Sequence, residues 1–432
     1  MDKLHLETLC VQAGYSPKTG ESRIPPITQS TTYFYGEARA MADLFDLKRD
    51  GFFYTRLANP TVEVLEKRVA ALEGGAYGIG CASGMSAILL TAMTLCEAGD
   101  NIVTSCEIYG GTFNLFSTTL PKFGIEARFF DADAPAEEIE KLIDDKTKFV
   151  YAETVANPAI VVLDFDKMAA ICKKAGVLFI VDNTLATPVL CRPLELGTDI
   201  VIHSTSKYMD GHAAALGGMI VDGGKFCYKD NSRYPAFNTP DESYHGLVYA
   251  DLPVAFGTKC RAQMMRDTGA IMSPQNAFLT YLGSDTLALR MERHCRNAEK
   301  IAQYLSKHPK IEWVRYSSLP TDKYHERAKK YLPNGTGGMM SFGIRGDVAA
   351  CARFMEHLKI ATQETHVADV RSCVLHPAST THRQLTEEQL VAAGIAPNLV
   401  RLSVGIENVD HLIADLAQAL ETVSSQKKVT LH

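Results

Sequence analysis

The sequence predicts an α/β protein built around a mainly parallel, doubly wound sheet. Short, nearly continuous apolar runs have the pattern of strands covered on both faces: "NIVTSC" (101–106), "FVYAET" (149–154), "LFIVDN" (178–183) and "DIVIHS" (199–204). Helical stretches such as "DFDKMAAICKKAG" (164–176) lie between some of them. This alternation favours parallel strand pairs with helices on both faces of the sheet.

The composition indicates a globular protein of more than one domain. The chain has 432 residues, 46% hydrophobic and 22% charged, with a net charge of −6. That length suits two or three domains, and the lack of a basic stripe argues against nucleic acid or an anionic membrane as a partner. No apolar run is long enough to span a membrane, and "MDKLHLETLCVQAG" lacks the features of a secretory signal. The 11 cysteines form no CxxC pair, so we expect a protein of the reducing cytoplasm.

The first helix follows a loosely patterned N-terminal segment. "SRIPPITQSTTYFYG" (22–36) predicts an extended, proline-punctuated arm. "NPTVEVLEKRVAALEGG" then predicts a helix with Asn59 as its cap, Pro60 in its first turn and Gly74 at its end.

A second helix is expected in "ASGMSAILLTAMTLCEAGD", between a Ser83 cap and a Gly99 terminator. Residues 222–253 are loop-like and rich in aromatic side chains, which makes them a candidate wall of a site.

The C-terminal part has the pattern of a separate α/β domain. A long helical stretch at 283–308 leads into it. "GGMMSFGI" (337–344) and "NLVRLSVGI" (398–406) predict strands, and "NVDHLIADLAQAL" (408–420) predicts a closing amphipathic helix.

Two charged residues follow neighbouring strands of the expected sheet. Asp182 ends "LFIVD", and Lys207 comes directly after "DIVIHSTS". Because ligands of open parallel sheets bind outside the carboxyl ends of the strands, we expect the two side chains to face each other across a cleft. Each residue alone also fits an ordinary role, Lys207 as a solvated surface lysine and Asp182 as a loop-capping acid.

The start of the second helix is a candidate anion site. Ser83, Gly84 and Met85 open that helix, whose free N–H groups and positive end attract anions, although a simple N-cap has the same pattern. A lysine, an acid and an anion site are together what pyridoxal 5′-phosphate (PLP) requires. The lysine forms a Schiff base with the aldehyde, and the acid keeps the ring nitrogen protonated so that the ring acts as an electron sink. Ser204 and Ser206 add hydroxyl donors for the phosphate.

Other cofactor patterns fit less well. In "GIGCASG", Gly78 and Gly80 resemble a dinucleotide loop, but Ser83 occupies the position of the third glycine. A phosphate loop before Lys225 would need a glycine where Met219 stands, and neither HExxH nor GxSxG occurs. The 13 histidines leave a zinc site open, yet no pair has ligand-like spacing beside an acid. We therefore expect no metal.

Several long stretches resemble the PLP enzymes of cysteine and methionine metabolism. They are "YTRLANPTVEVLEKRVAALEGG", "CASGMSAI", "VDNTLATPVLCRPLELGTDIVIHSTSKY" and the region from "LHPASTTHRQ" to "IADLAQAL". The resemblance implies an aspartate aminotransferase-like subunit of fold type I, in a homotetramer built from tight dimers. It also implies an N-terminal arm (1–55) that contacts the neighbouring subunit, a large PLP-binding domain (56–285) and a smaller C-terminal domain (286–432).

The resemblance assigns a role to each matching residue. Lys207 matches the Schiff-base lysine, Asp182 the partner of the pyridinium nitrogen, and Tyr109 the tyrosine stacked on the ring. Lys207 and Tyr109 are therefore the expected catalytic residues. The remaining implied cofactor contacts are Gly84, Met85, Ser204 and Ser206 at the phosphate, Tyr54 and Arg56 at the phosphate of the neighbouring subunit, and Glu153 and Asn157 near the ring hydroxyl.

Two further residues are expected at the substrate. Arg401 matches the arginine that binds the substrate α-carboxylate, and Val400, Leu402 and Val404 share one strand face, which leaves Arg401 on the other. His366 stands where the family pattern has Ser or Asn. It either tunes substrate selection or the pH profile, or serves as a hydrogen-bonded structural histidine.

Two features favour γ-replacement on O-acetyl-L-homoserine by sulfide or methanethiol. Gly111 stands where methionine γ-lyases have a cysteine, and residues 224–252 resemble the insertion of O-acetylhomoserine sulfhydrylases, including His245. The alternatives are a methionine γ-lyase, a non-catalytic binding protein on the same fold and, least compatible with the glycine pattern, a nucleotide-dependent oxidoreductase.

Overall fold

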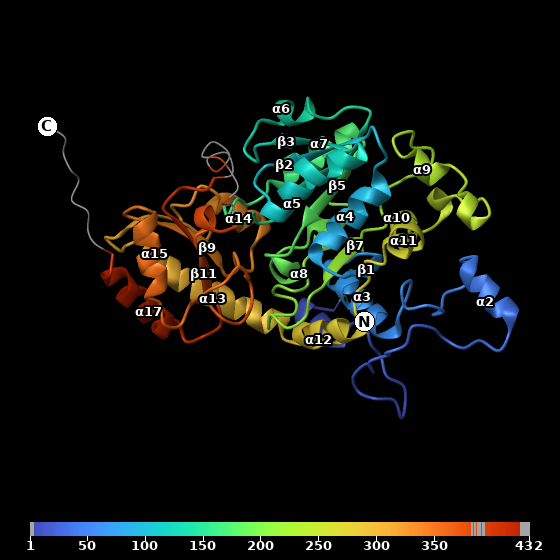
Figure 1. Ribbon diagram of the computed structural model, residues 1–432, viewed down its shortest axis with the longest axis horizontal. Helices are drawn as coiled ribbons and strands as arrows, with labels where there is room; N and C mark the ends of the chain where they lie inside the picture. Colours follow the sequence, from blue (N-terminus) through green and yellow to red (C-terminus); the bar gives the residue numbers. More distant parts are fainter. Residues whose placement is uncertain (1–3, 382, 384–385, 387–389, 391–393, 424–432) are drawn as a thin grey trace.

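The computed structural model describes residues 4–423 except 382, 384–385, 387–389 and 391–393. These residues form two β-sheets (Figure 1), a seven-stranded one in the order β1-β7-β6-β5-β4-β2-β3 and a five-stranded one in the order β10-β11-β12-β9-β8. The strands of the larger sheet are β1 (Tyr77–Cys81), β2 (Asn101–Ser105), β3 (Glu126–Phe130), β4 (Thr147–Glu153), β5 (Leu178–Asp182), β6 (Ile200–His203) and β7 (Gly218–Asp222). Those of the smaller sheet are β8 (Ile311–Arg315), β9 (Met339–Ile344), β10 (Thr362–Gln363), β11 (Cys373–Leu375) and β12 (Leu399–Ser403).

The larger sheet has the parallel centre that the sequence predicts. Strands β2 to β6 pair in parallel, and β7 and β1 complete one edge in antiparallel fashion. The four predicted runs are confirmed as β2, β4, β5 and β6. Strand β1 is not among the predicted runs. Its glycines allow a close helix contact, since a Cβ on Gly78 would lie 2.5 Å from the Glu66 carbonyl oxygen.

Both faces of the larger sheet are covered. Val181 of β5 belongs to one apolar core together with residues of α3 (Pro60–Glu73) and α7 (Phe165–Ala175). Its neighbour Ile180 belongs to a second core with residues of α4 (Gly84–Leu95). Successive strand residues point to opposite faces of the sheet, so apolar side chains cover both faces. The doubly wound architecture is confirmed.

Helix α3 begins and ends as predicted. The Asn59 side chain accepts a hydrogen bond from the Thr61 N–H, Pro60 is the first helical residue, and Gly74 closes the helix in the left-handed conformation at φ 75°.

Helix α4 begins at the predicted cap but ends earlier than predicted. The Ser83 hydroxyl accepts a hydrogen bond from the Ser86 N–H. The helix stops at Leu95 because Cys96 is extended, at φ −111° and ψ 147°. The prediction of Gly99 as terminator is therefore wrong, and Gly99, at φ 95°, lies in the turn that leads to β2.

The second sheet forms the other part of the molecule. Helices α12 (Pro274–Asp285) and α13 (Leu287–Leu305) lead to it, and α13, α15 (Val348–Glu356) and α17 (Val409–Glu421) share its apolar core. This part lies to the left of the larger sheet in Figure 1. The two predicted strands and the closing helix are confirmed as β9, β12 and α17. The shorter helices are α5 (Gly110–Asn114), α6 (Ala136–Glu140), α8 (Thr187–Leu190), α9 (Pro235–Asn238), α10 (Ala255–Lys259), α11 (Arg266–Thr268) and α14 (His325–Tyr331).

The N-terminal segment contains the predicted extended arm between α1 (Leu6–Gln12) and α2 (Ala38–Phe45). Helix α1 packs on α3, whereas α2 lies at the far edge of the molecule (Figure 1). Several large apolar side chains of the arm are exposed, and Phe34 is 94% exposed. In the described part of the chain, no helix is both long enough and apolar enough to cross a membrane.

Candidate active site

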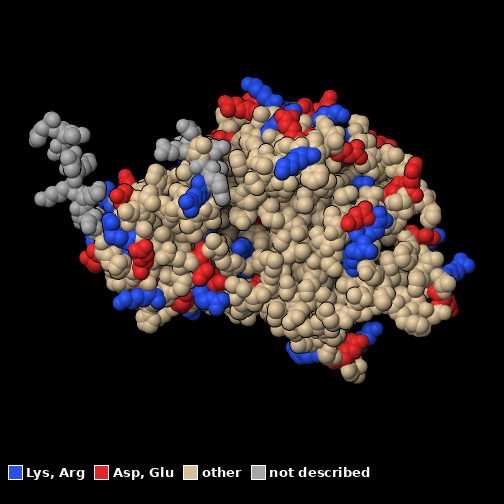
Figure 2. Space-filling model, viewed as in Figure 1, with Lys and Arg blue, Asp and Glu red and all other residues tan. Residues whose placement is uncertain are grey.

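A cavity of about 220 Å³ opens where the carboxyl ends of β4 to β6 meet the start of α4. Residues of the second sheet and its loops close it, and Figure 2 shows a hollow in the surface at the junction of the two parts. The predicted site residues that line this cavity are Gly84, Met85, Tyr109, Glu153, Asn157, Asp182, Ser204, Ser206, Lys207 and Arg401.

Lys207 lies in a turn just after β6. The Lys207 N–H bonds to the Ser204 carbonyl, and the Gly211 N–H bonds to the Lys207 carbonyl. Burial, together with the nearby positive charge of Arg401, lowers the pKa of the Lys207 amine to about 8. Its recorded hydrogen-bond partner is His366 Nδ1, 3.2 Å from Nζ, and no carboxylate of the described residues forms an ion pair with it. This environment raises the fraction of unprotonated, nucleophilic amine near neutral pH above that of a solvated lysine.

Two carboxyl groups lie side by side at the ends of β4 and β5. Glu153 and Asp182 are paired residues of these strands. Asp182 accepts a hydrogen bond of 2.9 Å from the Thr184 N–H, and burial raises its pKa. Burial and the charge of Asp182 raise the pKa of Glu153 well above its ordinary value. Asp182, a partly buried acid at the end of its strand, is suited to pair with a protonated ring nitrogen.

The first turn of α4 and the turn after β6 form a cradle for an anion. The Gly84 and Met85 N–H groups belong to the first turn, where a helix has no internal acceptors for them. A Cβ on Gly84 would lie 2.7 Å from the Ser204 Cβ, so only glycine permits this approach. The Ser204 and Ser206 hydroxyls lie 2.9 Å apart on the same side. Together these groups offer N–H and O–H donors to a phosphate.

Tyr109 forms a wall of the cavity at the start of α5. Its N–H donates a 2.6 Å hydrogen bond to Glu153 Oε1, and the side chain is half exposed. Gly111 leaves room for its ring, since a Cβ there would lie 2.6 Å from Tyr109 Cε1. An aromatic ring held in this way is available to stack on a planar cofactor.

Arg401 of β12 enters the cavity from the second sheet. The expected alternation is confirmed, because Val400 and Leu402 belong to the apolar core. Arg401 is 5% exposed, and burial lowers its pKa to about 10. Its recorded acceptors are Asn157 Oδ1 and the Thr365 and His366 carbonyls, all at 3.5 Å, and none of them is a carboxylate. A buried guanidinium with only weak neutral acceptors is suited to bind the carboxylate of a ligand.

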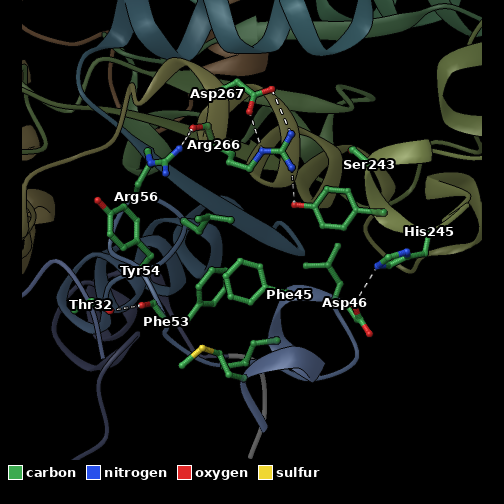
Figure 3. A pocket seen from close by; sticks show the side chains of 15 residues that line it. Thr32, Phe45, Asp46, Phe53, Tyr54, Arg56, Ser243, His245, Arg266 and Asp267 are labelled. Atoms are coloured by element: carbon green, nitrogen blue, oxygen red, sulfur yellow. Dashed lines mark hydrogen bonds and ion pairs between the residues drawn. The ribbon is translucent and has the colours of Figure 1, made fainter. Parts of the chain in front are cut away.

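Tyr54 and Arg56 lie at a second cavity, of about 520 Å³, between the arm and the 222–253 segment (Figure 3). The Arg56 guanidinium carbon is 5.2 Å from the centroid of the Tyr54 ring, and Arg56 donates to the Arg266 carbonyl. Within one chain the structure therefore does not bring these two residues to Lys207.

The 220 Å³ cavity at Lys207 is also lined by residues that the sequence does not predict for the site. Thr184 follows Asp182 by two positions, and Thr365 and Val367 flank His366. The signal for Thr184 was its place directly after the strand end. For Thr365 and Val367 the sequence held no comparable signal, because their loop approaches Lys207 only through the packing of the second sheet.

The residues present fit PLP. Gly84 leaves the space that a phosphate cradle needs, Asp182 is partly buried and forms no ion pair with a Lys or Arg of the described residues, and Lys207 is an amine with a lowered pKa. In the described ranges, no group of three or more His, Cys, Asp or Glu is arranged to hold a metal ion. Fold and site together define a PLP-dependent enzyme of fold type I.

Comparison with known proteins identifies the family. The family described as "Cys/Met metabolism PLP-dependent enzyme" matches residues 7–421. The homocysteine synthase of Schizosaccharomyces pombe is 45% identical and covers 96% of this chain and 98% of its own length. The O-acetyl-L-homoserine sulfhydrylase of Leptospira meyeri is 44% identical, with 96% and 97% covered. The chain belongs to the Cys/Met metabolism family of PLP-dependent enzymes.

A solved structure supports the same assignment. The crystal structure of an O-acetylhomoserine (thiol)-lyase from Campylobacter jejuni superposes with a TM-score of 0.94 at 44% identity, covering 97% of this chain and all of its own. That structure contains a lysine joined to pyridoxyl phosphate. The predicted fold type I and the PLP cofactor are thereby confirmed.

Proposed function

We propose that this enzyme catalyses γ-replacement on O-acetyl-L-homoserine, in which sulfide or methanethiol displaces acetate to give L-homocysteine or L-methionine. The observation that carries the proposal is the cavity in which the partly buried amine of Lys207 and the buried guanidinium of Arg401 lie together, with no carboxylate of the described residues paired to either. The names of the relatives supply the substrate, since they are homocysteine synthases and O-acetylhomoserine sulfhydrylases.

Each residue of the cavity has a defined task in this reaction. Arg401 binds the substrate α-carboxylate, and the Gly84 and Met85 N–H groups with the Ser204 and Ser206 hydroxyls hold the phosphate. Asp182 pairs with the ring nitrogen, Tyr109 covers the ring, and Glu153 and Asn157 lie near its hydroxyl. When bound, PLP supplies the electron sink that makes the substrate protons acidic.

Lys207 Nζ is the base of the proposed reaction. Loss of a γ substituent requires removal of a proton from Cα and then one from Cβ. The lowered pKa of Lys207 allows its neutral amine to accept a proton near neutral pH. The same nitrogen returns protons after the thiol has added.

Two observations favour a synthase over a γ-lyase. Gly111 stands where methionine γ-lyases have a cysteine. A Cβ at this position would displace the Tyr109 ring from its present position, so the ring as placed here fits the glycine. The insertion at 224–252 places Ser243, Tyr244 and His245 at the second cavity beside Tyr54 (Figure 3).

We further propose a homotetramer in the cytoplasm, in which the arm (1–55) of one subunit contacts the next. Support comes from the position of Tyr54 and Arg56, away from Lys207 of their own chain, and from the exposed apolar side chains of the arm. In this arrangement the large domain (56–285) and the small domain (286–432) of one subunit form a site that the neighbour's Tyr54 and Arg56 complete at the phosphate.

A substrate panel tests the function. The purified enzyme is incubated with O-acetyl- or O-succinyl-homoserine and with sulfide or methanethiol, and with methionine alone, and products are identified by mass spectrometry. We expect thiol transfer to O-acetylhomoserine and little 2-oxobutyrate from methionine. Rapid 2-oxobutyrate release from methionine without thiol transfer would identify a γ-lyase instead. A yellow protein whose visible band is lost on borohydride treatment, with Lys207 modified, binds PLP. If such a protein catalysed neither reaction, the proposed γ-replacement would be wrong and only cofactor binding would remain.

A further inference from the structure

His366 lies beside Lys207 without a role in the proposed function. It stands in the loop between β10 and β11, and its Nδ1 is 3.2 Å from Lys207 Nζ. The other ring nitrogen, Nε2, is buried and has no hydrogen-bond partner among the described residues, and Asp369 Oδ2 lies 3.8 Å from it. One nitrogen of the imidazole thus contacts the amine and the other faces a carboxylate.

The loop holds the imidazole in place. The His366 carbonyl accepts hydrogen bonds from the Cys373 thiol and from Arg401. Two positions further on, the Ala368 N–H donates to the Ser403 hydroxyl of β12. The neighbours Thr365 and Val367 line the cavity, while His366 contacts the base.

The charges around His366 favour a neutral imidazole at rest that can accept a proton. Burial and the positive charge of Lys207 lower its pKa, whereas Asp369, Asp210 and Glu364 raise it. When Lys207 loses its positive charge, the acids remain, and the side chain of Asp369 is only 10% exposed. Proton affinity therefore moves toward His366 at the moment when Lys207 gives up a proton.

We propose that His366 stores the first proton that Lys207 removes from the substrate. This inference rests on the proposed γ-replacement, which needs two successive deprotonations by one amine. Lys207 Nζ takes the Cα proton and becomes an ammonium, and the ammonium passes one proton to His366 Nδ1. The neutral amine then takes the Cβ proton, and the imidazolium faces Asp369. Acetate leaves Cγ as its anion, and the thiolate or hydrosulfide anion adds there. Lys207 then returns one proton to Cβ, and the proton from His366 passes back through Lys207 to Cα.

Hydrogen exchange tests the proton store in the holoenzyme. L-2-aminobutyrate has Cα and Cβ protons but no leaving group, so its exchange in D₂O reports the two deprotonations alone and is followed by ¹H NMR. His366→Asn keeps a polar side chain that cannot take a proton, and His411→Asn, at an exposed histidine of α17, is the matched control. The ratio of Cβ to Cα exchange is measured within one sample, so a loss of folded enzyme cancels.

We expect the Cβ to Cα ratio to fall at least tenfold in His366→Asn and to stay unchanged in His411→Asn. An unchanged ratio in His366→Asn would overturn the proposal. A wild-type enzyme that exchanges Cα but not Cβ would instead contradict the γ-chemistry on which it rests.

The tautomer provides a second test that needs no turnover. Solid-state NMR of the full-length apoprotein with ¹⁵N-labelled imidazole rings should show an unprotonated Nδ1 for His366, and Lys207→Ala should perturb that signal. A protonated Nδ1 in the resting protein would refute the assignment, because it leaves no lone pair for the lysine proton.

Discussion

The lowered pKa of Lys207 leads to a quantitative prediction for cofactor capture. An ordinary lysine has a pKa of 10.5, and burial lowers that of Lys207 to about 8. At pH 7.5 roughly one quarter of the Lys207 amine is therefore neutral, against about 0.1% for a solvated lysine. Since only the neutral amine attacks an aldehyde, apoprotein should capture PLP on the order of 200-fold faster than a free lysine of equal intrinsic reactivity.

Stopped-flow absorbance of apoprotein mixed with PLP between pH 6.5 and 10 measures this effect. The rate of PLP capture is divided by the rate for Nα-acetyl-lysine at the same pH, which removes the effect of the ionisation of PLP itself. We expect this ratio to fall above an inflection near pH 8. Arg401→Gln should move the inflection upward, because the positive charge of Arg401 lowers the pKa of Lys207. Arg353→Gln, at an exposed arginine of α15, should leave it in place. A ratio that stays flat from pH 7 to 10 would show that Lys207 titrates as an ordinary lysine.

The same shift affects stability, and its sign follows from proton binding. Because the pKa of Lys207 in the folded apoprotein is lower than in the unfolded chain, the unfolded chain binds more protons between pH 8 and 10.5. The free energy of unfolding should therefore rise with pH across that window, by up to about 3 kcal/mol from this residue. Urea unfolding of the apoprotein measures the slope, and Lys207→Met should reduce it. An equal slope in both proteins would contradict the burial argument.

The remaining predictions concern the other walls of the cavity. Gly84→Ala should push Ser204 away from the phosphate cradle. The clash costs about 2 kcal/mol and should weaken PLP binding by roughly 30-fold. A fluorescence titration that finds an unchanged affinity for PLP would show that the phosphate does not bind here. Arg401→Ala should raise KM for the amino acid by at least tenfold, so that steady-state kinetics with both KM and kcat unchanged would exclude carboxylate binding there. Lys207→Ala should still bind PLP through the cradle but lose turnover, and near-normal turnover would exclude it as the base.

Several parts of the fold and the site could be predicted from local sequence. The strands β2, β4, β5 and β6 are encoded by continuous apolar runs, and α3 by Asn59 and Gly74 at its ends. Asp182 and Lys207 could be placed at one edge of the sheet because the carboxyl ends of parallel strands meet there. These features depend on hydrogen bonds and burial within a few residues of the chain.

Other features depended on which residues the packing brings together. Gly99 has the sequence pattern of a helix terminator, yet the extended backbone at Cys96 ends α4 first. Arg401 was assigned to the site only through the family resemblance, because its strand pattern alone favours an exposed arginine. The contact between His366 and Lys207 joins positions 159 residues apart.

The sequence by itself determined the layered α/β fold, through the alternation of apolar strands and helices. It also determined the lysine, the acid and the anion-binding turn at one edge of the sheet, because each of these three is set by the residues of one strand and the turn after it. Only the tertiary structure decided which loop of the second sheet faces that edge. The packing of the second sheet and its loops against the first sheet sets the distance between His366 and Lys207, and neither strand pattern contains that distance.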